Sequence, residues 1–301
     1  MGFKLVNVDG RAALASDGHY YDLNEISGGA VSDDPMQALA AASQLSALNA
    51  ALGGMTPAGN LADANLLAPV PRPPQGFGIG LNYRKHAEEA NMDIPEVPMV
   101  FTKYPASVTG PTGDVVLRSN YVDYEGELVV VIGAPAKDVA VEDGWRHVAG
   151  LCVGQDISDR AVQFASTPPQ FNLGKSFDTF SPLGPMVVSP DALDNPGALR
   201  LTTRVNGEVR QDDTTGDLIF DVPALVSYLS HIMTLQTGDV IFTGTPSGVG
   251  AVQGLFLRDG DEVVTTIEGL GTMTNRCVRG PDHPNATAVT PFVAGIAARK
   301  D

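Results

Sequence analysis

The chain has 301 residues, of which 43% are hydrophobic and 18% charged, a balance that allows a large core and excludes global disorder. The formal net charge of −16 and the sequence pI near 4.5 argue against binding of nucleic acids and against an anionic membrane surface. Capture of an anionic substrate would therefore depend on local cationic side chains or on a metal ion.

The cysteines and the start of the chain indicate the setting of the protein. Cys152 and Cys277 are too few for a disulfide framework and lack the spacing of a zinc site. The first residues have no apolar signal-peptide region, and no apolar run approaches the roughly 20 residues of a membrane span. The sequence therefore predicts a reduced, cytoplasmic setting and no membrane partner.

Residues 1–70 are expected to form a small N-terminal α+β domain. Three short strands joined by Asp-Gly turns are predicted over residues 3–7, 11–15 and 19–23. A helix with leucines along its apolar face is predicted over residues 36–51. The proline-rich residues 69–74 that follow predict a stiff linker to the next domain.

Residues 71–282 are expected to form a larger, β-rich α+β domain, followed by a surface tail over residues 283–301. A helix capped by Asn82 is predicted over residues 83–90, and a second helix over residues 222–235. Strands, with a hairpin at Asn206-Gly207, are predicted over residues 99–103, 128–133, 201–205, 208–210, 240–242 and 262–267.

An acidic segment precedes the most apolar strand. Asp123, Glu125 and Glu127 stand at alternate positions, so in an extended chain their side chains leave from one face. The β-branched run that follows predicts a buried strand, and carboxylates at the end of such a strand need a partner. A hard divalent cation is one such partner. A solvated acidic edge strand is the alternative.

Asp156 is the best third oxygen ligand, because it stands where another apolar stretch gives way to a polar turn. An ordinary capping aspartate would look the same at that position. Three carboxylates suit Mg²⁺ or Mn²⁺, with Ca²⁺ as an alternative, better than Zn²⁺, which prefers His and Cys. The five histidines show no paired ligand spacing.

Several other polar residues are candidates for chemistry. His86 and Glu89 lie three apart on a predicted helix and share a face, which suits a general base or a chance surface pair. Lys175, flanked by glycine and aromatic residues, suits charge stabilisation or a plain surface position.

Three further residues, from two segments, could contact substrate. Arg160 and Gln163 follow Asp156 at four and seven residues. The Thr-Gly-Thr-Pro turn that contains Thr245 offers hydroxyl and backbone N–H groups, which suit a carboxylate or mark only a turn.

Together and in this order, these motifs resemble the fumarylacetoacetate hydrolase family. The resemblance covers about residues 72–280 and is weak over the first 70. One small departure is Gln236-Thr237, where a proline is common. The matching motifs are Gly80-Leu81-Asn82-Tyr83 with His86 and Glu89, Phe101 with Lys103, Asp123-Tyr124-Glu125 with Glu127, Gln155-Asp156 with Arg160 and Gln163, Gly174-Lys175-Ser176-Phe177, Gly238-Asp239-Val240-Ile241, Thr243-Gly244-Thr245-Pro246 and Ile267-Glu268-Gly269-Leu270-Gly271.

The resemblance implies a role for each matching residue. Glu125, Glu127 and Asp156 would hold Mg²⁺ or Mn²⁺. A lid would carry His86 and Glu89 as a water-activating pair. The remaining matches imply an oxyanion-stabilising role for Lys175 and substrate contacts for Arg160, Gln163 and Thr245. The family fold is a mixed β-sandwich roll with a small N-terminal domain, usually a homodimer.

The expected reaction is metal-dependent hydrolysis of a carbon–carbon bond in an acylpyruvate-like 2-oxo acid through an enolate. Decarboxylation of oxaloacetate, or isomerisation of a hydroxymuconate-type acid in catabolism, needs the same enolate and is the alternative. A metal-stabilised binding module without turnover is a third reading, which the intact His86, Glu89 and Lys175 disfavour.

Overall fold

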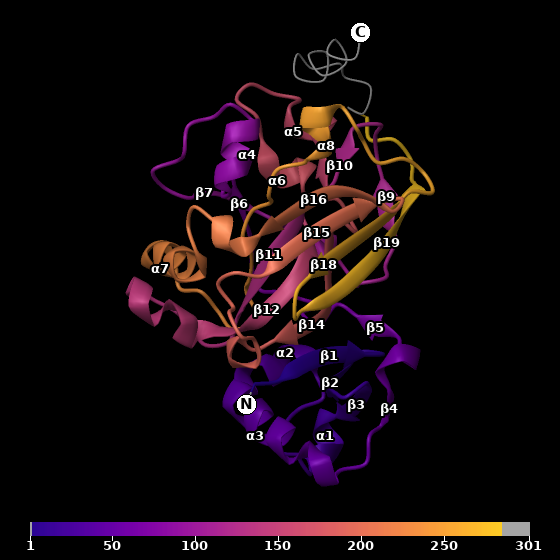
Figure 1. Cartoon of the computed structure of the whole chain (residues 1–301), viewed down its shortest axis with the longest axis vertical. Helices are drawn as coiled ribbons and strands as arrows, with labels where there is room; N and C mark the ends of the chain where they lie inside the picture. Colours follow the sequence, from indigo (N-terminus) through magenta and orange to yellow (C-terminus); the bar gives the residue numbers. More distant parts are fainter. Residues whose placement is uncertain (1, 285–301) are drawn as a thin grey trace.

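The computed structural model describes residues 2–284 and shows an α+β, β-rich body (Figure 1). Two large sheets pack against each other, which confirms the predicted fold class. Helices are short and lie around the sheets: α1 (Leu23–Ile26), α2 (Pro35–Ala38), α3 (Ala42–Ala51), α4 (Arg84–Glu89), α5 (Arg160–Gln163), α6 (Phe171–Gly174), α7 (Val222–Ile232) and α8 (Gly250–Gln253).

The larger sheet has twelve strands. Two of them branch from the main path: β5 (Leu66–Leu67) pairs with β1, and β8 (Val108–Thr109) pairs with β14. In spatial order the others are β4 (Gly59–Asn60), β3 (His19–Asp22), β2 (Arg11–Ser16), β1 (Lys4–Val8), β14 (Ser181–Val188), β12 (Val148–Gln155), β11 (Gly126–Ile132), β17 (Val240–Phe242), β6 (Gly76–Gly80) and β7 (Met99–Thr102).

The second sheet has five strands, and a separate strand pair lies beside the two sheets. That pair consists of β10 (Val122–Asp123) and β13 (Ser158–Asp159). The five strands in order are β16 (Glu208–Thr214), β15 (Arg200–Val205), β18 (Glu262–Ile267), β19 (Gly271–Arg279) and β9 (Val115–Leu117).

Strand β11 forms the centre of the core, as its apolar run predicts. Leu128 and Val130 pack towards the second sheet and α7, while Val129 and Val131 pack towards the N-terminal strands and helices. A strand covered on both faces is apolar at every position rather than at alternate ones. The acidic residues at its start therefore stand at the edge of a dry core.

The first 70 residues continue the larger sheet. Strand β1 pairs with β14, with Lys4 opposite Val188, and Leu5 lies in the same core cluster as Val129 and Val187. In Figure 1 these strands occupy the lower end of the molecule. The division of the chain near residue 70 stays a prediction.

The dipeptide turns are confirmed. Asn206 and Gly207 have φ angles of 52° and 81°, as a two-residue type I′ hairpin turn requires, and both Asp-Gly turns also have positive φ. The helix expected over residues 36–51 is divided into α2, a 3₁₀ turn and α3. The predicted helix over residues 222–235 ends earlier, at Ile232.

The prediction that Asn82 caps α4 was wrong. Its side-chain NH₂ donates to the carbonyl oxygens of Phe220 and Thr243, and its side-chain oxygen accepts from the N–H of Phe220. Asn82 therefore ties the start of α4 to two distant segments, and the cap residue Tyr83 makes no side-chain capping bond.

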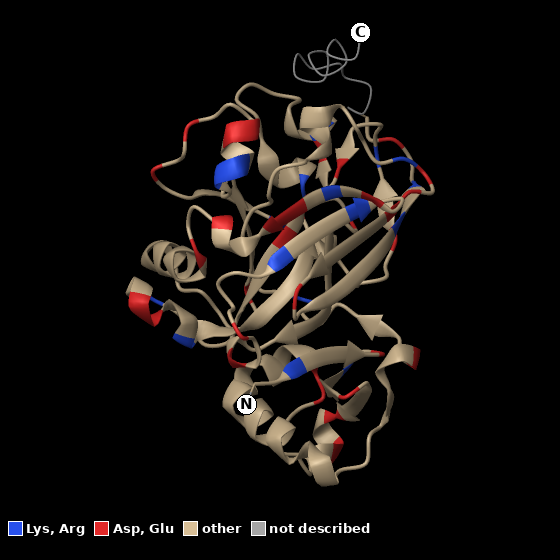
Figure 2. Ribbon diagram, in the orientation of Figure 1, with Lys and Arg blue, Asp and Glu red and all other residues tan. Residues whose placement is uncertain are grey.

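Charged residues are spread over both ends of the molecule (Figure 2). Within residues 2–284, no helix is long and apolar enough to cross a membrane. Most of the predicted tail, residues 285–301, lies outside the described residues.

Candidate functional site

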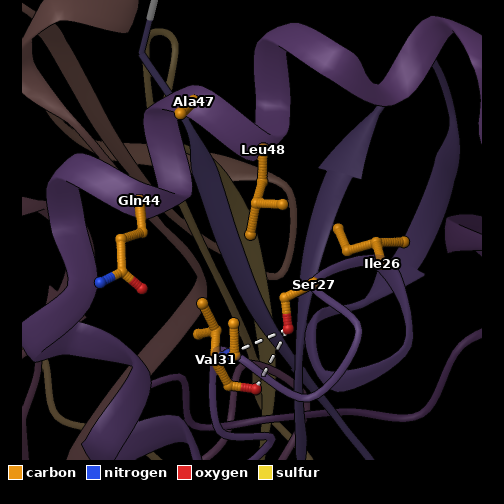
Figure 3. Close-up of a pocket in the computed structure, with 7 residues that line it drawn as sticks. Ile26, Ser27, Val31, Gln44, Ala47 and Leu48 are labelled. Carbon is orange, nitrogen blue, oxygen red and sulfur yellow. Dashed lines mark hydrogen bonds between the residues drawn. The ribbon is translucent and has the colours of Figure 1, made fainter.

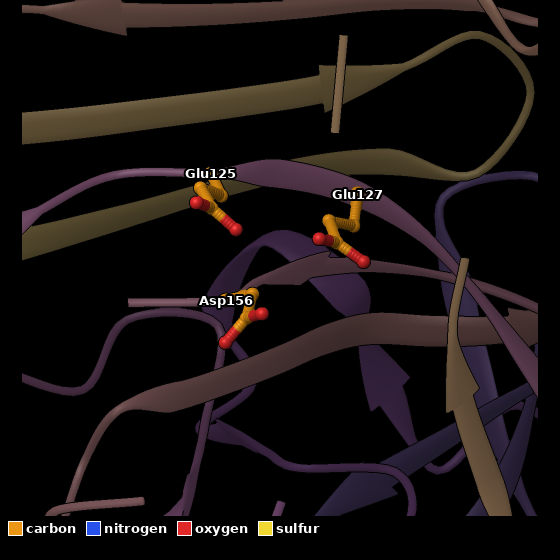
Figure 4. Close-up of side chains that lie close together, drawn as sticks. All are labelled: Glu125, Glu127 and Asp156. Atoms are coloured by element: carbon orange, nitrogen blue, oxygen red, sulfur yellow. The ribbon is translucent and has the colours of Figure 1, made fainter. Parts of the chain in front are cut away.

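The structure brings Glu125, Glu127 and Asp156 together (Figure 4), with one ligand oxygen of each within 4.8 Å of the others. Strands β11 and β12 are antiparallel neighbours, and Gly126 pairs with Gln155. That register places the start of one strand beside the end of the other, so acids 29 or more positions apart in sequence meet. All three side chains are buried.

Asp123 does not share this position, so the expected common face of three acids was wrong. The extended chain is interrupted between Asp123 in β10 and Gly126 in β11. The Asp123 carboxylate instead accepts hydrogen bonds from the N–H groups of Gly250 and Ala251, at 2.8 and 2.9 Å. It also forms an ion pair with Arg160 at 2.7 Å.

Three buried cations surround the acids. Lys175 Nζ lies 2.7 Å from Glu125 Oε2 and 2.7 Å from Asp156 Oδ2. Arg160 bridges Asp123 and Glu125, and Lys103 pairs with the other oxygen of Asp156. Lys103 has no predicted role, although its place in a matching motif at the end of an apolar strand was the available signal.

The surroundings shift the pKa values of Glu125 and Glu127 in opposite directions. Burial alone would raise the pKa of Glu125, but Lys175 and Arg160 lower it below its usual value. Burial, together with the negative charges of Asp156 and Glu125, raises the pKa of Glu127 well above its usual value. Among residues 2–284, Glu127 forms no ion pair, and its Oε2 accepts from the N–H of Gly244 at 2.8 Å.

This donor set fits a hard divalent cation. Buried carboxylates that repel each other are stabilised when a cation lies between them, and oxygen ligands suit Mg²⁺ and Mn²⁺. A bound cation would stabilise Glu127 most, because Glu127 is the acid of the cluster without a cationic contact in the described chain.

Helix α4 brings His86 and Glu89 together, with His86 Nδ1 3.5 Å from Glu89 Oε2. The Glu89 carboxylate also accepts from the N–H of Gly248, at 3.0 Å from Oε2. Partial burial raises the pKa of Glu89, but the adjacent His86 side chain and the hydrogen bond from Gly248 outweigh it and lower the pKa. Glu89 therefore stays ionised beside Nδ1, which leaves Nε2 of His86 for other contacts.

Gln163 and Thr245 are held by protein groups. Gln163 Oε1 accepts from Arg160 Nη1 at 2.8 Å. The Thr245 hydroxyl donates to the carbonyl oxygen of Gly126 at 2.9 Å and accepts from Gln211 Nε2 at 2.7 Å. Gln211, which stands 34 residues before Thr245 in strand β16, had no sequence signal.

A cavity of about 400 Å³ collects most of these residues. Its walls are otherwise mainly apolar. The polar side chains that line it are His86, Glu125, Arg160, Gln163, Lys175 and Thr245. All six are positions predicted from the sequence.

A second hollow, of about 380 Å³, lies in the N-terminal part between Ile26, Val31 and Leu48 (Figure 3). Among the described residues, its lining contains no ionisable side chain. Six of the residues predicted to act in the site line the first cavity instead.

Comparison with known proteins gives consistent results. The family model described as fumarylacetoacetate (FAA) hydrolase C-terminal matches residues 75–278. The human mitochondrial oxaloacetate tautomerase FAHD2A is 42% identical over 238 residues, which cover 78% of this chain and 76% of the relative. The oxaloacetate tautomerase YisK of Bacillus subtilis (strain 168) is 45% identical over 226 residues, covering 72% and 74%.

Solved structures share the same fold. A Mycobacterium smegmatis protein assigned as HpcE has a TM-score of 0.85 at 40% identity, covering 92% of this chain and 99% of that one. Maleylpyruvate hydrolase from Sphingobium sp. SYK-6, in complex with manganese(II) and pyruvate, has a TM-score of 0.78 at 31% identity, with the same coverage. The matched motifs, the β-rich fold and these similarities show that the chain belongs to the fumarylacetoacetate hydrolase family.

Proposed function

We propose that this protein catalyses the keto–enol isomerisation of a 2-oxo acid and depends on Mg²⁺ or Mn²⁺. The observation that carries the proposal is that His86, beside the ionised Glu89, lines the same cavity as Glu125 and Lys175. The relatives that are 42% and 45% identical are named oxaloacetate tautomerases, which favours isomerisation over the hydrolysis expected from the sequence.

In this proposal Glu125, Glu127 and Asp156 hold the ion. Their converging oxygens support that assignment, and so does the burial of Glu127 beside two other carboxylates, which a bound cation would relieve. A divalent ion at this position supplies Lewis-acid stabilisation of negative charge on the keto oxygen of the substrate.

The side chains of the protein would move the proton. His86 Nε2 takes the proton from C3 of the 2-oxo acid, and Glu89 stabilises the imidazolium that forms. Lys175 directs an N–H group towards the oxygen at which negative charge develops. The imidazolium then returns the proton to that oxygen, which gives the enol and restores neutral His86.

Hydrolysis of an acylpyruvate is the second candidate, because the manganese-bound solved structure is a maleylpyruvate hydrolase. The same His86 would then activate a water molecule against the distal carbonyl, and the bond between the acyl carbon and C3 would break. Oxygen-18 from solvent in a product carboxylate would identify hydrolysis. Decarboxylation would release carbon dioxide without that label.

The finer expectations stay predictions. They include the homodimer, the cytoplasmic location and the small N-terminal domain expected over residues 1–70. Arg160, Gln163 and Thr245 are proposed to contact the substrate because all three line the same cavity as Glu125.

The test uses the full chain with Mg²⁺ or Mn²⁺ and follows the ultraviolet absorbance of 2-oxo acid enols. We expect metal-dependent tautomerisation, and a fall in kcat of about 10²–10⁴-fold in His86→Ala, the usual contribution of a general base. His231→Ala, an exposed histidine on α7, is the control. An unchanged rate in His86→Ala would refute the assignment of the base.

A further inference from the structure

The cavity of about 400 Å³ has a polar end, where Glu125, Arg160 and Lys175 lie, and a wall that is mainly apolar. Among the large apolar side chains that line it are Met92, Met99, Phe101, Phe164, Phe171 and Val252. They come from four places in the chain, namely the segment after α4, strand β7, the α5–α6 region and α8. A ligand that leaves the polar end therefore meets hydrophobic surface.

The aromatic part of this wall begins beside the polar end. The ring centroid of Phe101 lies 5.0 Å from Lys175 Nζ. Phe171 packs edge-on against Phe101 and Phe164, with centroid separations of 5.9 and 6.3 Å. A group attached to C3 of a 2-oxo acid held near Lys175 would therefore contact aromatic rings at once.

The cations of the cavity are already engaged by protein carboxylates. Lys175 contacts Glu125 and Asp156, and Arg160 contacts Asp123 and Glu125. His86 lies beside Glu89. Among the described residues that line the cavity, no other Lys, Arg or His is present to pair with a second substrate carboxylate.

The balance of charge at the polar end also disfavours a second substrate carboxylate. Its four carboxylates (Asp123, Glu125, Glu127 and Asp156) exceed its three cations (Lys103, Arg160 and Lys175) by one. Glu89, which stays ionised beside His86, adds one further negative charge, so the carboxylates of the protein outnumber its cations here. A second carboxylate in an apolar cavity would be desolvated without a partner, which is costly.

We propose that the preferred substrate is a 2-oxo acid with an uncharged aromatic or bulky aliphatic group on C3, rather than a dicarboxylate. This inference rests on the proposed function, because it specifies the substrate class of the same site. Met92 and Met99 are flexible enough to adapt to such a group at the mouth of the cavity.

The experiment compares two probes, phenylpyruvate and oxaloacetate, whose enols both absorb in the ultraviolet. With the full chain and saturating Mn²⁺, we expect kcat/KM for phenylpyruvate tautomerisation to exceed that for oxaloacetate at least tenfold after correction for the spontaneous rates. The opposite preference would overturn the inference and leave the proposed function intact. No metal-dependent tautomerisation of either probe would overturn both.

Substitutions of apolar side chains that line the cavity give a second test of this inference. Met99→Lys places a cation of similar length at a position that is already 41% exposed, so folding should be preserved. We expect the preference to shift at least tenfold towards oxaloacetate. Met92→Lys, at a 55% exposed position, should shift it in the same direction.

The matched control is Leu173→Lys. This side chain is 60% exposed and lies on α6 close to the site, but it does not line the cavity. It adds the same charge at the surface, so the ratio of the two kcat/KM values should stay unchanged. If Met92→Lys and Met99→Lys change the ratio no more than Leu173→Lys does, the apolar wall does not select the substrate.

Discussion

Glu127 is the residue whose environment conflicts most with a stable metal-free protein. It is buried beside Glu125 and Asp156, and its pKa is raised by burial and by these two charges. A carboxyl with a raised folded-state pKa stabilises the fold below its ordinary pKa and loses that contribution as pH rises through the raised value. A divalent cation that binds the ionised form would offset the loss.

We therefore expect the melting temperature of chelator-treated protein to fall as pH rises from the ordinary carboxyl range to the raised pKa of Glu127. Glu127→Gln should remove this fall and raise the melting temperature at neutral pH, by about 2–4 °C for each kcal/mol recovered. The affinity for Mn²⁺ should rise about tenfold per pH unit over the same window, because one proton competes with the ion.

Calorimetric scans with and without Mn²⁺ measure both effects. Glu142→Gln removes an exposed carboxylate in the same chain and should leave the pH dependence as it is in the wild type. An identical pH dependence in Glu127→Gln and wild type would show that another group is responsible.

The segment after β17 organises the site at the level of elements. Its backbone N–H groups donate to three carboxylates from different places: Gly244 to Glu127, Gly248 to Glu89, and Gly250 to Asp123. The segment thus connects the proposed metal cluster to the proposed base. Gly248 has a φ of 101°, and a Cβ there would lie 2.0 Å from the carbonyl oxygen of Arg210.

Gly248→Ala should displace this segment and release Glu89. We expect roughly a 10²-fold fall in kcat, the scale of a misplaced catalytic group, with Mn²⁺ affinity close to that of wild type. The control is Gly260→Ala, which has a similar φ of 86° but no atom within 4 Å of the new Cβ. Equal losses in the two variants would attribute the effect to backbone strain alone.

The whole molecule is tied together across residue 70 by sheet pairing and by a shared core. Leu5 is fully buried in the cluster that contains Val129 and Val187. The single tryptophan, Trp145, lies after residue 70 and packs against the core cluster that contains Leu128 and Val130. Its fluorescence therefore reports whether residues 1–70 and the rest of the chain unfold together.

Leu5→Ala should lower the stability seen by Trp145 by about 2–5 kcal/mol, the usual cost of a large-to-small core substitution. Denaturant titration followed by tryptophan fluorescence measures this. Leu67→Ala, at a 39% exposed position, should change it little. A Trp145 transition that Leu5→Ala leaves unmoved would mean that residues 1–70 fold as an independent domain.

Local patterns in the sequence determined several features correctly. Alternation along an extended chain placed Glu125 and Glu127 together, and the apolar run after them specified the central strand. The Asp-Gly and Asn-Gly pairs specified their turns, because few residues tolerate positive φ. The family motifs identified all six polar side chains of the cavity.

Only the tertiary structure decided how distant groups pair. Lys103 meets Asp156 across 53 positions and Gln211 meets Thr245 across 34, because strand order and register bring them together. Asp123 lies outside the acid cluster because the strand is interrupted after it, and the N-terminal strands extend the larger sheet by pairing with β14. Backbone periodicity is a local property that a sequence displays, whereas ion pairs and sheet edges depend on contacts that form only when the whole chain has folded.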